Sequence, residues 1–185
     1  RIFYSFWSGR EQNAYSKRNN GVLIRKQLIL FVYITLALTH LHSAFPLSPK
    51  EFLGYELGDR FTYHHKVVEY FKQVASSSNS IHLINYGETY EGRPLIIAII
   101  THPDNKLSVG EIRKNHMISS GLQEGEEPEN DFALVWLSYS VHGNESSSTE
   151  AAMETLYSFA NTSNENTMEW LKRTVLIIDP CMNPD

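Results

Sequence analysis

The sequence predicts an α/β fold, and two patterns carry this prediction. Residues 132–140 and 174–179 are apolar runs, the second rich in β-branched residues, and a helical pattern lies between them. Strand, helix and strand at this spacing predict a parallel pair joined by a right-handed crossover. Residues 81–86 and 94–101 are strand-like runs that flank a short connection with two glycines, which predicts a β-hairpin.

Two segments precede the hairpin. Residues 48–61 contain two glycines and a proline, so we expect an extended segment there. Residues 62–75 carry apolar side chains at helical spacing, and the serines at 76–78 end this predicted helix. His64 and His65 fall in its first turn, and we interpret both as surface residues without a ligand role.

An interrupted helical pattern follows the hairpin. We expect a helix over residues 107–120 and an acidic surface loop over 121–130. We also expect the sheet to end on strand 174–179, whose outer edge would then be unpaired and prone to aggregation.

The helix of the crossover is predicted over residues 147–160. Ser147 and Glu150 have the spacing of a capping box, in which each side chain satisfies a free backbone N–H at the helix start. A second, short helix is predicted over 167–172, beginning after Asn166.

Composition and charge narrow the class of protein. The chain has 185 residues, of which 42% are hydrophobic and 20% are charged, as expected for one globular domain with a real core. Residues 1–44 carry a net charge of +5 and residues 45–185 a net charge of −10. The acidic body argues against nucleic acid as a partner, because phosphate binding needs clustered Lys and Arg. Cys181 is the only cysteine, so no internal disulfide can form, and we expect a buried thiol.

The N-terminal region has the layout of a secretory signal peptide, which we place at residues 22–44. Arg25 and Lys26 precede the eleven-residue apolar run 28–38, and two small residues follow. Eleven residues are few for a membrane span, so no stable membrane insertion is expected after cleavage. The alternatives are an uncleaved anchor and a buried helix. We expect an extracellular or periplasmic protein, and residues 1–21 are left unassigned.

His142 and Glu145 are the candidate metal ligands. They follow the first of the two parallel strands, and residues 181–185 follow the second. Parallel strands end at the same edge of a sheet, where α/β proteins form their sites. Catalytic zinc often takes two His and one Glu, and Gly143 permits a tight turn between these two side chains. The alternative is a polar surface loop, because His-x-x-Glu alone is a common pattern.

Three short motifs give this sequence a family resemblance. "ETYEGRPL" (88–95), "HGNE" (142–145) and "NPD" (183–185) occur in an order that resembles the zinc metallocarboxypeptidases of the carboxypeptidase A/B and N/E type. The resemblance implies a mixed, mostly parallel central sheet flanked by helices. It also implies that residues 45–185 are the N-terminal part of the catalytic domain, truncated at its C-terminus.

The same resemblance implies a function. His142 and Glu145 match the family's first two ligands of Zn²⁺, and the reaction would remove a C-terminal amino acid from a peptide with a free C-terminus. The bound zinc would polarise the scissile carbonyl and activate water. The family's third ligand and its general-base glutamate would lie beyond Asp185. The catalytic residues are therefore not in this sequence, and residues 1–185 alone are expected to be inactive.

Asn144 leaves the substrate open. Pancreatic-type members carry an arginine at this position, whereas this chain resembles the N/E-like branch or related branches. One alternative is a zinc amidase or deacylase on the same scaffold, acting on cell-wall peptides or acylated amino acids. Another is a non-catalytic peptide-binding relative. Asn144 and Asn161 also begin formal Asn-x-Ser glycosylation sequences, and the first is discounted because it lies in the candidate site.

Overall fold

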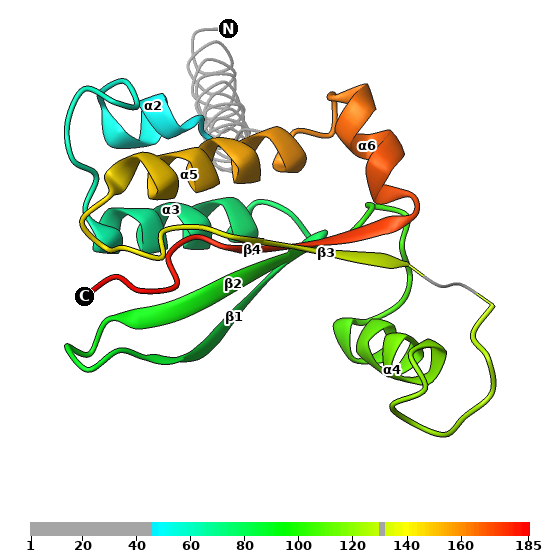
Figure 1. The fold of residues 1–185 in the computed structure, drawn as a ribbon. Coiled ribbons are helices and arrows are strands. Elements are labelled where there is room, and N and C mark those ends of the chain that lie inside the picture. Colours follow the sequence, from blue (N-terminus) through cyan, green and yellow to red (C-terminus); the bar gives the residue numbers. More distant parts are fainter. Residues whose placement is uncertain (1–45, 130–131) are drawn as a thin grey trace, which may run out of the picture. The chain divides into compact units, whose positions relative to one another are not determined.

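Four strands form one mixed sheet with the order β1-β2-β4-β3 (Figure 1). The structure is a computed structural model, and it describes residues 46–129 and 132–185. β1 pairs with β2 and β2 with β4 in antiparallel fashion, whereas β3 and β4 are parallel. The bounds are Ile81–Glu88 for β1, Pro94–Ile100 for β2, Ala133–Ser138 for β3 and Thr174–Asp179 for β4.

This topology confirms the α/β class, the mixed sheet, the hairpin and the parallel crossover pair. Among the four described strands, the parallel pairing occurs between β3 and β4. The prediction that the sheet ends on residues 174–179 is wrong, because β4 lies between β2 and β3. β4 is buried on both faces, as an interior strand must be, whereas Val135 and Trp136 of β3 are 40% and 59% exposed.

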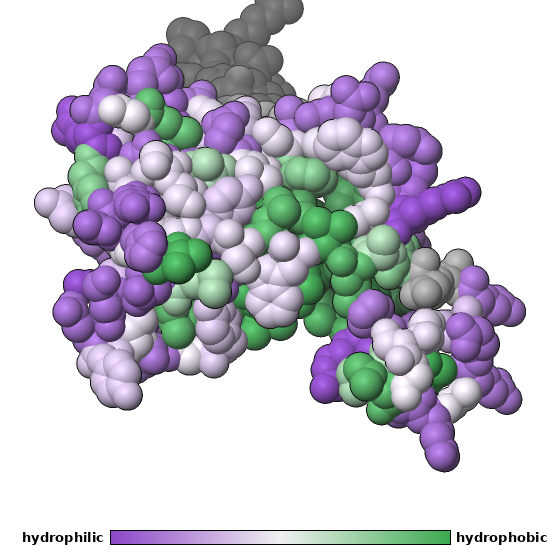
Figure 2. Space-filling model, in the orientation of Figure 1, coloured by the Kyte–Doolittle hydropathy of each residue, from purple (hydrophilic) through white to green (hydrophobic). Residues whose placement is uncertain are grey.

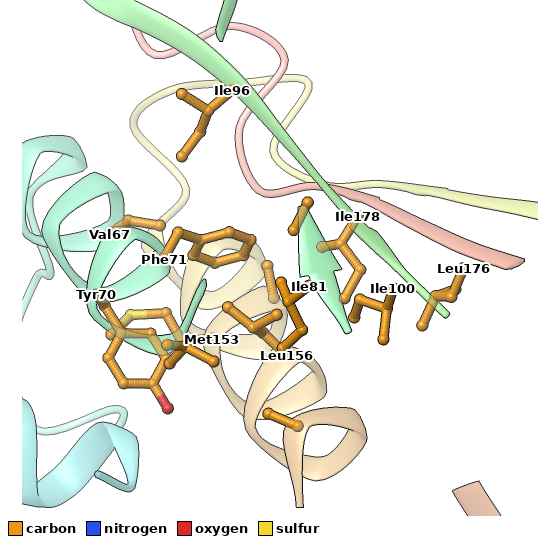
Figure 3. Close-up of a cluster of buried hydrophobic side chains, with 14 of the residues drawn as sticks. Val67, Tyr70, Phe71, Ile81, Ile96, Ile100, Met153, Leu156, Leu176 and Ile178 are labelled. Carbon is orange, nitrogen blue, oxygen red and sulfur yellow. The ribbon is translucent and has the colours of Figure 1, made fainter. Parts of the chain in front are cut away.

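Two helices cover one face of the sheet and enclose the main core (Figure 3). These are α3, His64–Ser76, and α5, Ser146–Ala160. Phe71 of α3 and Met153 and Leu156 of α5 are fully buried, and they belong to one cluster with Ile178 of β4. The apolar stripes predicted for both helices therefore face the sheet.

The opposite face carries a smaller cluster beside α4, Val109–Ser119. Ile112 of this helix packs with Ile99 and Val175 of the sheet. Figure 2 shows apolar side chains gathered on the molecular surface between α4 and the helical layer on the other face. The helix predicted over 107–120 is confirmed in this position.

Residues 48–61 were predicted to be extended, but they begin with the short helix α2, Pro49–Leu53. Ser48 and Glu51 form a capping box, in which the Glu51 carboxylate accepts from the Ser48 N–H at 2.9 Å. Pro49 occupies the first turn, and Gly54 ends the helix with φ of 76°. The proline and the first glycine, which predicted an extended segment, therefore lie at the start and the end of a short helix.

The predicted capping box of α5 is also wrong. The helix begins at Ser146, so Glu150 lies in its second turn and on its buried side. Glu150 is only 4% exposed, and its carboxylate accepts hydrogen bonds from Gly58 N and Thr62 Oγ1, both at 2.7 Å. It therefore anchors the loop between α2 and α3 instead of capping its own helix.

The short helix after α5 exists, but it begins earlier than predicted. α6 covers Glu165–Leu171, and its cap is Asn164, whose Oδ1 accepts from Thr167 N at 3.4 Å. Asn166 lies inside the first turn. Two asparagines two residues apart offer the same capping chemistry, and the tertiary fold selects the first.

The predicted signal peptide at 22–44 and the unassigned residues 1–21 lie outside the described residues. Within residues 46–129 and 132–185, no helix is both long enough and apolar enough to cross a membrane. Cys181 is free and 2% exposed, which confirms the predicted buried thiol.

Candidate metal centre

The segments that follow β3 and β4 stay paired beyond the ends of the strands. Tyr139 N donates to Asp179 O at 2.9 Å, Met182 N to Tyr139 O at 3.1 Å, and Asn183 N to Ser140 O at 3.3 Å. The carboxyl ends of both parallel strands therefore meet at one edge of the sheet, as the sequence predicted.

Ser140 redirects the chain into the turn that holds the candidate ligands. It is buried and has a φ of 51°, a left-handed conformation that is costly for a residue other than glycine. Its N–H donates to Ser148 Oγ at 2.8 Å, and its own Oγ donates to His142 O at 3.0 Å. Hydrogen bonds to both sides thus hold this strained residue at the start of the turn.

His142 and Glu145 lie in one tight turn, in which Glu145 N donates to His142 O at 3.2 Å. Both residues are exposed, and neither side chain has a hydrogen-bond partner among the described residues. Imidazole nitrogen and carboxylate oxygen are ligands that catalytic zinc uses, so the donor types fit two of its three protein positions. Within the described part of the chain, no three His, Cys, Asp or Glu residues gather closely enough to hold a metal.

Gly143 is required by the close approach of the segment that follows β4. A Cβ at this position would lie 2.6 Å from Asn183 O, 2.8 Å from the Pro184 carbonyl carbon and 2.9 Å from Asp185 O. Asn183 also donates through Nδ2 to Val141 O at 3.2 Å. The 142–145 turn is therefore packed, backbone against backbone, onto residues 183–185.

Asp185 ties this pair of segments to the hairpin. Its carboxylate accepts hydrogen bonds from Thr89 Oγ1 at 2.6 Å, from Glu91 N at 3.2 Å and from Arg93 Nη1 at 3.1 Å. Arg93 also donates to Pro184 O. The hydrogen bond from Thr89, followed by that from Glu91 and the charge of Arg93, lowers the pKa of the Asp185 carboxyl below its usual value.

Sequence reasoning did not assign Thr89 and Arg93 a role in this cluster. The motif at 88–95 is recognisable in the sequence, but the sequence does not predict which segment its side chains contact. The structure brings residues 88–95, 142–145 and 183–185 together through the bonds described above.

A second side-chain contact joins β1 to the end of β4. Asp179, the last residue of β4, is 3% exposed and accepts from Tyr86 Oη at 2.8 Å and from Cys181 N at 3.3 Å. Burial raises the pKa of the Asp179 carboxyl, and the bond from Tyr86 partly opposes this shift. The bulged end of β1 is thereby fixed to the strand that leads into residues 181–185.

A cavity of about 710 Å³ opens beside the cluster, between the start of α3, the hairpin connection and residues 143–144 and 181–185. His64 lines it and is not the surface residue that we predicted. Its Nε2–H donates to Pro94 O at 2.9 Å, and its Nδ1 is buried without a partner among the described residues. Burial lowers the pKa of His64 below its usual value. His65 is exposed, as predicted.

Comparison with known proteins identifies the family. A model of the zinc carboxypeptidase family matches residues 67–185, so the chain belongs to this family and the predicted membership is confirmed. No curated protein matches the chain in a search by sequence.

Solved structures share the fold. The crystal structure of thrombin-activatable fibrinolysis inhibitor is similar with a TM-score of 0.51 and 13% identity, over 75% of this chain and 28% of that one. Carboxypeptidase A from Helicoverpa armigera is similar with a TM-score of 0.50 and 15% identity, over 88% of this chain and 32% of that one. The chain thus spans about a third or less of the length of these two proteins.

Proposed function

We propose that the full-length protein is a zinc-dependent carboxypeptidase, that it removes C-terminal amino acids from peptides, and that His142 and Glu145 are two ligands of its zinc. One observation carries this proposal. The 142–145 turn is hydrogen-bonded and packed onto residues 183–185, which Thr89 and Arg93 in turn hold against the hairpin. Three segments far apart in sequence are thus joined at one edge of the sheet, next to the turn that carries the two proposed ligands.

The residues of this chain would hold the metal and set its geometry. Zinc, when bound, would polarise the scissile carbonyl and lower the pKa of a water molecule. His142 would bind through a neutral ring nitrogen, and Glu145 through its carboxylate. Ser140 and Gly143 fix the backbone of the turn without help from a metal, so the two side chains start from a common, preorganised turn.

Two substitutions test the ligands in the full-length protein. His142→Ala and Glu145→Gln each remove one ligand and no core side chain. We expect each to lower zinc content and to lower kcat/KM for a peptide with a free C-terminus by more than about 100-fold, since even outer-shell changes cost 10–100-fold. Metal analysis and peptide hydrolysis should be measured on the same samples.

Matched controls make the result specific. His82→Ala and Glu165→Gln change exposed residues of the same types on β1 and α6, and both should leave zinc content and activity unchanged. Full activity of either ligand variant would eliminate the proposed site. Hydrolysis of acylated amino acids or cell-wall peptides, with no hydrolysis of free-C-terminus peptides, would instead favour an amidase or deacylase.

Export is the second part of this proposal. The basic pair at 25–26 and the apolar run that follows support a signal peptide at 22–44 and a secreted protein. Expression of the gene from its own start should yield a mature N-terminus near Phe45, as determined by N-terminal sequencing. A product that begins upstream of Lys26 and stays in the cytoplasm would contradict it.

A further inference from the structure

We propose that Asn161 carries an N-linked glycan whose first sugar lies in the groove between α5 and α6. The inference rests on the proposed export, because the glycan is added in the secretory pathway. It stands on three observations: the sequence Asn161-Thr162-Ser163, the geometry of its asparagine, and the chemistry of the groove beside it.

The asparagine is arranged so that its nitrogen is free in the folded chain. Asn161 ends α5 and its Oδ1 accepts from Ser163 N at 3.0 Å, which forms an Asx turn. Its backbone N–H donates to Tyr157 O, and its carbonyl accepts from Asn164 N. No hydrogen bond of the described residues uses Asn161 Nδ2, and Thr162 and Ser163 are exposed. A sugar on Nδ2 therefore breaks none of these contacts.

The covalent step is the ordinary transfer from a polyprenyl diphosphate-linked oligosaccharide. Asn161 Nδ2 forms a bond to the anomeric carbon, and the bond from that carbon to the diphosphate oxygen breaks. The lipid diphosphate leaves with the electron pair, and the amide nitrogen gives up one proton to the solvent. The product amide keeps one N–H and its Oδ1, so the Asx turn survives in the glycosylated protein.

The groove has the chemistry to receive a sugar. It has a volume of about 510 Å³ and is lined by residues of α5 and α6 and by Asn164. Figure 1 shows that the short connection from α5 to α6 holds residues 161–164. Phe159 and Trp170 line it, with ring centroids 6.2 Å apart, and Trp170 is 60% exposed. Ser158 supplies a hydroxyl group and Asn164 an amide group. A sugar ring offers C–H groups on its faces and hydroxyls on its rim, which fit an aromatic floor with polar edges.

The second glycosylation sequence differs in its surroundings. Asn144 lies in the 142–145 turn and lines the cavity beside the candidate metal centre. Ser146, the third residue of this glycosylation sequence, is the first residue of α5, and its backbone carbonyl accepts from Thr149 Oγ1 at 2.9 Å. A glycan at Asn144 would fill the proposed active site, so Asn144 provides the internal comparison for Asn161.

The first experiment translates the full-length protein in the presence of microsomes. One arm uses its own leader and the other a heterologous cleavable leader. We expect a protease-protected chain with a glycan at Asn161 that an endoglycosidase removes. Ser163→Ala should lose this glycan while keeping the backbone N–H that Asn161 needs, and Ser163→Thr and Asn144→Gln should keep it.

The outcomes separate this inference from the proposed function. A protected chain whose number of glycans is the same with and without Ser163→Ala overturns the assignment to Asn161. If only the heterologous leader gives a protected chain, the proposed export by the natural leader is wrong. The arm with the heterologous leader then still shows whether Asn161 is glycosylated. A second glycan that is lost in Asn144→Gln would contradict the proposed metal centre and leave Asn161 assigned.

The second experiment tests the groove by hydrogen exchange of residues 159–171 in the secreted protein. Exchange should be slower in the glycosylated protein than in Ser163→Ala. In a Trp170→Ala background this difference should shrink several-fold, because the aromatic floor is gone. An equal effect of the glycan in both backgrounds would show that the sugar does not lie in the groove.

Discussion

Substitution of Gly143 by alanine tests whether the 142–145 turn is packed as tightly as the structure indicates. The added Cβ would lie 2.6 to 2.9 Å from three backbone atoms of residues 183–185, closer than real Cβ contacts. Backbone cannot rotate away as a side chain can, so one of the two segments must shift. Overpacking of this kind costs about 1–3 kcal/mol of unfolding free energy, and this loss lowers the ratio of folded to unfolded protein by about 5- to 150-fold.

The assay is urea unfolding of the full-length protein, combined with zinc analysis. Gly143→Ala should unfold at lower urea and bind zinc more weakly, because the turn carries both proposed ligands. Gly110→Ala in α4 is the matched control: its Cβ would meet only Ser108 Oγ, at 3.9 Å. It should stabilise by about 0.4–1 kcal/mol through the entropy of the unfolded chain. Unchanged stability and zinc content in Gly143→Ala would refute the packing argument.

Three further predictions concern stability. Glu150→Ala removes the acceptor of one buried and one partly buried hydrogen bond and should cost about 2–4 kcal/mol, whereas Glu154→Ala on the exposed side of α5 should cost little; equal urea midpoints would contradict the anchor role. Leu156→Ala opens a cavity in the main core and should cost about 2–5 kcal/mol, which calorimetry can measure; a loss below 1 kcal/mol would argue against full burial. The pKa of His64 is lower in the folded chain than the ordinary value of about 6.5, so the unfolded chain binds a proton at His64 more tightly. Neutral His64 therefore favours the folded state above pH 6.5, and this contribution to the free energy of unfolding is lost as pH falls through the folded pKa. His64→Gln should weaken the pH dependence of the urea midpoint between pH 7.5 and 5.5, and His65→Gln should preserve it; the reverse order would disprove the assignment.

Local patterns were sufficient for most elements of the fold. β-Branched runs identified residues 174–179 as a strand, and their separation from 132–140 by a helix predicted the parallel pair, because chain chirality allows one common crossover. The 3.6-residue spacing of apolar side chains identified the buried faces of α3 and α5. These signals are local or depend on a single connection, so the sequence carries them directly.

The candidate site was predicted in part for the same reason. His142 and Glu145 share one short turn at the end of a parallel strand, and the strand order alone places that turn beside residues 181–185. Their role as zinc ligands remains a prediction. The contribution of Arg93 could not be read from its motif, because its partners Pro184 and Asp185 are more than 90 residues away.

Tertiary contacts decided the rest. The spacing of Ser147 and Glu150 fits a capping box, but a buried position beside Gly58 and Thr62 gives the carboxylate two donors that a local cap cannot match. His64 had the neighbours of a surface residue in sequence, but it is half-buried and bonded to Pro94 of the hairpin. A polar side chain takes the partners that the fold brings to it, and a partner some 30 or 90 residues away leaves no periodic trace in the sequence. The type and order of the main elements therefore follow from local patterns in the sequence, whereas the polar groups that join these elements can be identified only in the folded chain.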